Sequence, residues 1–115
     1  MPPDPVRIEE TAAWIKKSRK DLWRAGIALN LDPSDTEDCL FHSQQAVEKS
    51  LKALLIWQDQ PFRKTHDLVE LTRQCTDMEP ALKDVMHGLG SLTRFAKVRE
   101  VLAAVENLLP PEVPQ

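Results

Sequence analysis

The chain has 115 residues, the usual size of one domain, and a chain of this length buries about two-thirds of its unfolded surface. Hydrophobic residues make up 42% of it and charged residues 29%, with three glycines and no tyrosine, which favours helices over a turn-rich β architecture. A net charge of -3 excludes a general attraction to nucleic acid or to a membrane surface, so any RNA contact must come from a local patch. No basic leader or long apolar run is present, which predicts a cytoplasmic protein without a membrane partner.

The apolar periodicity predicts a first helix from Arg7 to Asn30. One face recurs at steps of three or four residues: Trp14, Ser18, Leu22, Ala25 and Leu29. The opposite side is basic: Lys16, Lys17, Lys20 and Arg24. Six prolines near the two ends predict short extended tails around a core of about 7–109.

A second, longer helix is predicted from Asp35 to Gln58, because Ser34 and Glu37 have the spacing of a capping box. Its apolar side is Leu40, Val47, Leu51, Leu54 and Leu55. Beside this side runs a stripe of small residues that would let another helix approach closely: Cys39, Ser43, Ala46, Ser50 and Ala53. We therefore expect this helix to be packed on two sides.

Three shorter helices complete the prediction. Thr65 is the expected N-cap of a helix from His66 to about Gln74, and a capping box of Thr76 and Glu79 would open a fourth helix that ends near Leu92. A fifth is expected from Phe95 to Leu109. The predicted fold is all-α, an up-and-down antiparallel bundle of four to five helices that forms a single domain over residues 1–115.

The second predicted helix carries a distinctive run of residues. Phe41-His42-Ser43-Gln44-Gln45-Ala46-Val47-Glu48-Lys49-Ser50-Leu51-Lys52-Ala53-Leu54-Leu55 is followed by Thr65-His66-Asp67-Leu68, and Asp21-Leu22 precedes both. This pattern resembles the HEPN domain of prokaryotes over about Trp14 to Arg99. The resemblance implies a helical bundle that commonly forms a homodimer, and small HEPN proteins are often paired with a minimal nucleotidyltransferase in a toxin–antitoxin-like system.

Many HEPN proteins are metal-independent ribonucleases that use an arginine followed four to six residues later by a histidine. The matching stretch here contains Arg94 and Arg99, and no histidine follows either of them. Because a general acid–base group contributes about 10²- to 10⁴-fold to rate, we expect no efficient catalysis by that mechanism. Some family pairs modify a tyrosine, and this chain has none to serve as the acceptor.

Three groups of residues are candidates for binding a ligand or a partner. On the second helix, His42, Gln45, Lys49 and Lys52 form one polar row, which would hold phosphate or an acidic partner, or would simply be a solvated face. Arg63, Lys64 and His66 form a cationic cluster at a predicted helix start, where His66 has an alternative structural role. Arg94, Lys97 and Arg99 surround Phe95, as in a weak stacking platform or a charged surface beside a buried ring.

These residues leave three functions open. The leading hypothesis is a weakly catalytic or non-catalytic partner of a nucleotidyltransferase. The second is a ribonuclease that combines Arg94 or Arg99 with His42 or His66, and the third is a nucleotide-binding or scaffolding helical module. No metal site or cofactor is indicated, since Cys39 and Cys75 lack ligand spacing and are expected to be buried free thiols. Trp23, together with the small-residue stripe, is the predicted interface.

Overall fold

The computed structural model describes residues 4–61, 67–87 and 95–114, and within these ranges the chain forms five helices and no strand. The helices are α1 (Pro5–Asn30), α2 (Thr36–Trp57), α3 (Leu68–Met78), α4 (Leu82–Met86) and α5 (Phe95–Asn107). This confirms the predicted all-α bundle. None of the described helices is both long and apolar enough to cross a membrane.

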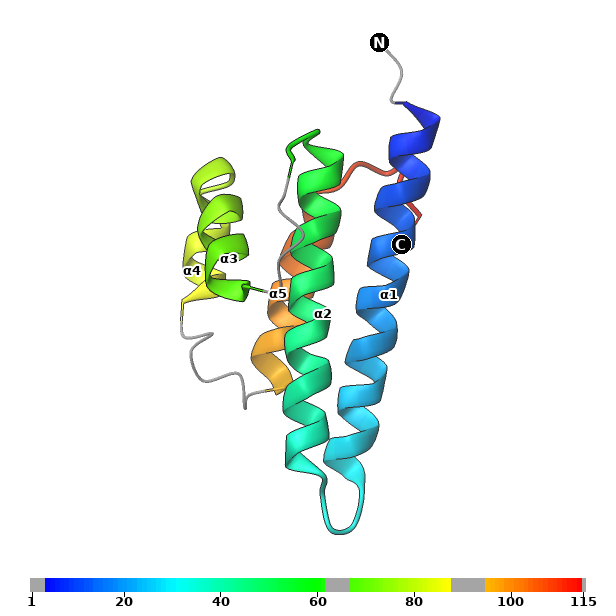
Figure 1. Cartoon of the computed structure of the whole chain (residues 1–115), viewed down its shortest axis with the longest axis vertical. Helices are drawn as coiled ribbons and strands as arrows, with labels where there is room; N and C mark the ends of the chain where they lie inside the picture. The colour runs from blue at the N-terminus through cyan, green and yellow to red at the C-terminus, as the bar shows by residue number, and fades with distance from the viewer. Residues whose placement is uncertain (1–3, 62–66, 88–94, 115) are drawn as a thin grey trace.

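The two long helices form the frame of the bundle (Figure 1). Helices α1 and α2 pack as an antiparallel hairpin, and α5 lies against both of them. The short helices α3 and α4 lie on the side of α2 that faces away from α1, where α3 contacts α2 and α4 contacts α5. Helix α2 is therefore covered on two sides, as predicted.

Helix α1 begins at Pro5, earlier than the predicted Arg7. The Asp4 carboxylate accepts a hydrogen bond from the Val6 backbone N–H at 3.0 Å, and proline suits the first helical position because no intrahelical bond needs its missing N–H. The buried stripe of the helix is Thr11, Ile15, Ser18, Asp21, Ala25 and Ala28. Leu29 was expected on the inner face and is instead 39% exposed, because the stripe passes through Ala28.

The turn between α1 and α2 is closed by different residues from those predicted. Asp35, not Ser34, is the N-cap of α2, and its carboxylate accepts from the Asp38 N–H at 3.0 Å. The Ser34 hydroxyl instead donates to the Leu29 carbonyl at 2.6 Å, at the open end of α1. The capping box predicted for Ser34 and Glu37 is therefore wrong.

The C-terminal end of α2 is closed by a Schellman arrangement. The Gln60 N–H donates to the Leu55 carbonyl and the Asp59 N–H to the Ile56 carbonyl, at 2.9 and 3.0 Å. This geometry places Asp59 at a φ of 54°, in the left-handed region where a short polar side chain is tolerated better than most.

All five small residues of the predicted stripe are buried in α2. The Ser18 hydroxyl of α1 donates to the backbone carbonyl of Ala46 at 2.8 Å, which requires the two helices to approach closely. On the other side of α2, Val47, Leu51, Leu54 and Leu55 enter the main core, while Leu40 is half-buried and lies outside it. The core also takes residues from the other helices: Ile15, Leu71, Cys75, Leu82, Val98, Val101, Leu102 and Val105.

The short helices differ from the prediction at their ends. Asp67 is the N-cap of α3, where its carboxylate accepts from the backbone N–H groups of Val69 and Glu70, so the helix begins at Leu68. The predicted cap Thr65 and the predicted first residue His66 lie outside the described residues. Helix α3 also continues past Gln74 to Met78, and the Thr76 hydroxyl donates to the Thr72 carbonyl inside the helix at 2.9 Å, where it does not cap the next helix.

Helix α4 has no capping box. Glu79 closes α3 by donating its N–H to the Cys75 carbonyl, and Ala81 precedes α4 without any side-chain cap. The helix ends at Met86, and the remainder of the predicted span, from 88 to 92, lies outside the described residues.

The segment after α5 is not the free tail that its prolines predicted. Leu109 and Val113 are 7% and 1% exposed and belong to the main core. The chain passes from the end of α5 across to the N-terminal half of α1 (Figure 1), where Pro114 shares a surface hollow with Ala12 and Lys16. The core therefore extends beyond the predicted limit at residue 109.

The close contact between α1 and α2 predicts a strong effect of volume at Ala46. Ala46→Leu would force the helices apart and destabilise the chain by about 2–3 kcal/mol, measured as the free energy of unfolding in urea. The matched control is Ala13→Leu on the exposed side of α1, which should change stability by less than about 0.5 kcal/mol. Equal effects of the two substitutions would contradict the close contact.

Cys75 anchors α3 to α2, because its thiol is fully buried and lies 3.7 Å from the Leu51 carbonyl. Burial raises the pKa of this thiol from 9.0 to about 12, so at pH 8 its thiolate fraction is on the order of a thousandfold lower than in the unfolded chain. In a Cys39→Ser variant, we expect iodoacetamide to label Cys75 rapidly in urea and very slowly in the native protein, as followed by mass spectrometry.

The same pKa sets the sign of a pH effect on stability. Above about pH 9 the thiol ionises in the unfolded chain, whereas in the folded chain it stays protonated until about pH 12. The stability that the buried thiol contributes is thus fully present below pH 9 and is lost as the pH rises toward 12. A Cys75→Ala variant should lack this component, and rapid native labelling at pH 8 would contradict the burial.

Candidate functional site

The polar row of α2 is turned toward α1 and is held there by one buried carboxylate. Asp21 of α1 has a side chain that is only 4% exposed, and it bonds to His42 through one oxygen and to the Lys49 ammonium through the other. The His42 Nδ1 lies 2.8 Å from Asp21 Oδ1, and because an ionised carboxylate only accepts, this nitrogen carries the proton. The other ring nitrogen lies 3.6 Å from the Asp38 carboxylate.

A second charged pair lies further along the same interface. The Lys52 ammonium is 3.8 Å from the Glu48 carboxylate, and both side chains are buried. The same ammonium lies 5.4 Å from the centre of the Trp14 ring, and the Lys17 ammonium lies 5.0 Å from that centre. Trp14 of α1 therefore lies over the ammonium of a buried ion pair that is formed within α2.

These contacts change the interpretation of the row. His42 and Lys49 are 15% and 24% exposed and both serve Asp21, while Gln45 between them is half-buried. The solvated face considered from the sequence is thus replaced by a polar layer within the α1–α2 interface. The positive charge of Lys49 is already compensated by Asp21, which leaves little of it to attract phosphate.

Arg99 lies elsewhere, in an open groove of about 470 Å³ between α1 and α5. The groove is lined by Arg19, Leu22, Trp23, Gly26, Ile27, Asn30, Phe95 and Arg99. Gly26 matters for its shape, because a Cβ at this position would lie 3.2 Å from Cζ of Phe95. The ring can therefore rest directly against α1.

Trp23 is 64% exposed in this groove. The sequence prediction joined Trp23 to the small-residue stripe of α2 in one surface, and this is wrong because α1 itself covers the stripe. Trp23 instead neighbours Phe95 and Arg99 from α5.

The remaining candidates divide into two sets. Arg63, Lys64, His66 and Arg94 lie outside the described residues. Of the ribonuclease combinations, Arg99 with His42 can be placed, and His42 is bound in the α1–α2 interface and does not line the groove that contains Arg99.

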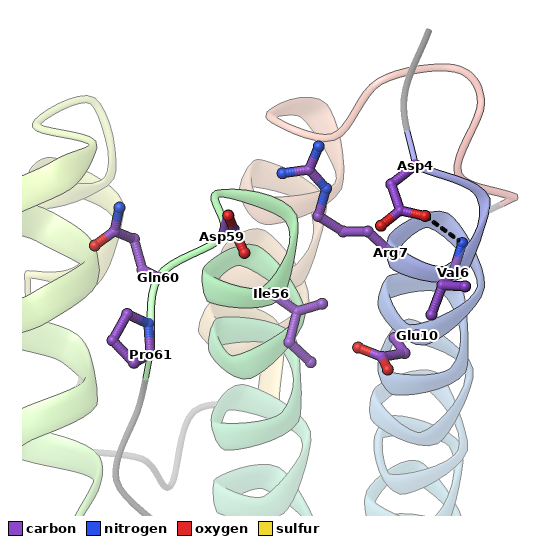
Figure 2. A pocket seen from close by; sticks show the side chains of 8 residues that line it. All are labelled: Asp4, Val6, Arg7, Glu10, Ile56, Asp59, Gln60 and Pro61. Carbon is purple, nitrogen blue, oxygen red and sulfur yellow. Dashed lines mark hydrogen bonds between the residues drawn. The ribbon is translucent and has the colours of Figure 1, made fainter.

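A further hollow, of about 480 Å³, lies between the start of α1 and the end of α2 (Figure 2). Arg7 extends across it from α1 and lies 5.2 Å from the centre of the Trp57 ring, while Asp4 and Glu10 line the α1 side and Asp59 follows α2. Three carboxylates against one guanidinium make this hollow unsuitable for an anion such as phosphate.

Sequence reasoning missed the role of Asp21. It considered Asp21 only as part of the Asp-Leu pair. The spacing of Asp21 could have indicated burial, because it follows Ser18 by three residues and precedes Ala25 by four, on the buried stripe. An acidic residue at a buried position needs a cationic partner, and the polar row of α2 supplies two.

The buried carboxylate predicts a large effect of removing Asp21. Asp21→Ala would leave Lys49 without its partner and destabilise the chain by about 3 kcal/mol in urea unfolding. Adding Lys49→Met should restore part of this loss, because the second substitution removes the uncompensated charge. Asp77→Ala, at an exposed position of α3, is the control and should cost less than about 0.5 kcal/mol. A loss at Asp21 no greater than at Asp77 would contradict the role assigned to the pair.

Comparison with known proteins gives one family. The family model described as HEPN domain matches residues 11–104, which include most of α1, all of α2, α3 and α4, and most of α5. No curated protein and no solved structure matches the chain. Because the match covers most of the sequence, including Asp21, the polar row of α2 and Arg99, the chain belongs to the HEPN domain family.

Proposed function

We propose that this HEPN protein acts as the binding partner of a nucleotidyltransferase in a toxin–antitoxin-like pair, without efficient catalysis of its own. The observation that carries the proposal is membership of the family combined with the loss of its ribonuclease motif. The three histidines, His42, His66 and His87, all precede Arg94 and Arg99, so neither arginine has the histidine that should follow it.

The contacts of His42 support the same proposal. Its Nδ1–H donates to a buried carboxylate that also binds Lys49, so removing the imidazole from this position would break an α1–α2 contact. A proton-transfer group must reach the reacting atoms, and this ring is only 15% exposed. The residue is better suited to fixing the two helices than to replacing the missing catalytic histidine.

Binding, as opposed to modification, is the mode that the composition favours. A nucleotidyltransferase that attaches a nucleotide to tyrosine would find no acceptor in this chain. We therefore propose a stable complex of the two proteins. The family's common homodimer suggests that this chain enters the complex as a dimer.

Co-expression tests this function directly. The chain and the nucleotidyltransferase encoded beside it should elute as one complex in size-exclusion chromatography with light scattering, and intact mass spectrometry should show no nucleotide on the HEPN chain. Elution of the two proteins separately at micromolar concentrations would overturn the proposal.

An RNA assay tests the absence of catalysis. The purified chain should leave both structured and single-stranded RNA intact, and the Arg99→Ala variant should give the same result. Cleavage by the wild-type chain that disappears in Arg99→Ala would contradict the proposal and favour the ribonuclease hypothesis.

A further inference from the structure

We propose that the groove between α1 and α5 binds an acidic, amphipathic helix of the partner protein, with an apolar side chain seated against Trp23 and Phe95 and a carboxylate paired with Arg99. The proposal rests on the function above, because it names the surface and the chemistry by which the partner is recognised. It adds that the polar row of α2 is not the docking surface.

The floor of the groove is apolar and continuous across two helices. Leu22, Trp23 and Ile27 lie on adjacent turns of α1, and Trp23 and Ile27 are 64% and 44% exposed. The absence of a side chain at Gly26 lets Phe95 of α5 complete this floor. Exposed aromatic and aliphatic groups that meet in one hollow are the usual anchor points of an amphipathic helix.

The charged residues around this floor all have one sign. Arg19 and Arg99 line the groove, and no aspartate or glutamate is among its described lining residues, although the chain as a whole has a net charge of -3. Arg19 bonds through Nε to Glu106 at 2.7 Å, whereas no ion pair joins the exposed Arg99 to a carboxylate in the described parts of the chain. The complementary ligand therefore carries carboxylates together with an apolar anchor.

A nucleic acid fits this groove less well than a protein helix. A single strand needs a track of cations for successive phosphates and flat rings for successive bases. The groove offers the guanidinium of Arg19, which is already bound to Glu106, and the exposed guanidinium of Arg99. Part of its floor is aliphatic and is formed by Leu22 and Ile27.

A second copy of the chain is also a poor occupant. In a two-fold contact through this groove, each copy would present the exposed Arg99, and neither would present a carboxylate among the described residues that line it. The like charges would repel each other, so we assign the groove to a different, acidic chain.

The test measures binding of the nucleotidyltransferase to variants of the full chain by isothermal titration calorimetry. Trp23→Ala and Arg99→Glu should each weaken binding at least about tenfold. The matched controls lie on helices that do not line the groove: Val69→Ala, which alters an apolar residue of α3 that is 68% exposed, and Lys83→Glu, which reverses an exposed charge on α4. Both should leave affinity within about twofold. Circular dichroism and urea unfolding confirm that each variant is folded.

A charge-reversal experiment identifies the acidic contact. Cross-linking locates the partner segment that lies on the groove, and a Glu→Lys or Asp→Lys substitution there should restore binding to Arg99→Glu while weakening binding to the wild-type chain. Hydrogen exchange in the complex should slow in residues 22–30 and 95–99.

The possible outcomes separate the two proposals. If the complex forms and Trp23→Ala and Arg99→Glu bind as tightly as wild type, the groove proposal is overturned while the partnership stands. If no complex forms, both fail. Two other outcomes would also overturn the groove proposal, each with the affinity for the partner unchanged. If the two substitutions dissociate a homodimer, the groove binds a second copy of this chain. If they abolish binding of a fluorescein-labelled single-stranded RNA, the groove binds nucleic acid.

Discussion

The close approach of α1 and α2 is the constraint on which the rest of the molecule depends. Small side chains on α2 bring the helices near enough for a serine hydroxyl on α1 to reach a backbone carbonyl of α2. At this separation Asp21 cannot be hydrated, so its charge must be compensated by side chains of the facing helix. The polar residues of the family's characteristic run are thereby drawn into the interface, where they fix the register of the two helices.

This constraint also decides where the molecule can bind a partner. The small-residue stripe and the polar row are enclosed between α1 and α2. Two faces of α1 lie outside this interface: its basic side and the side that lines the groove with α5. The groove combines the exposed Trp23 of α1 with Arg99 of α5. The surfaces available for recognition are therefore a consequence of helix packing and not of the motif residues themselves.

The sequence predicted the parts of the fold that depend on periodicity. The two long helices and the buried stripe of α2 follow from spacing alone, because a helix of more than twenty residues repeats its pattern many times. The fifth helix is shorter, but its apolar residues still recur at helical spacing. The ends of the helices were less predictable. Ser34 and Thr65 are residue types that often cap helices, and nothing local reveals that Asp35 and Asp67 compete for the same roles. Contacts between distant residues, such as Val113 with the core or Arg19 with Glu106, leave no periodic signal.

The packing of the C-terminal part of the chain against the rest of the bundle affects the order in which the molecule folds. The hairpin of α1 and α2 is made of contacts between neighbouring elements, which helical chains form quickly. By contrast, the bond between Arg19 of α1 and Glu106 of α5 joins residues that lie 87 positions apart. The groove between α1 and α5 comes into existence only when this distant closure is complete. A partner that binds there distinguishes a finished bundle from a chain that has formed only its hairpin, so recognition at this groove would also act as a check on folding.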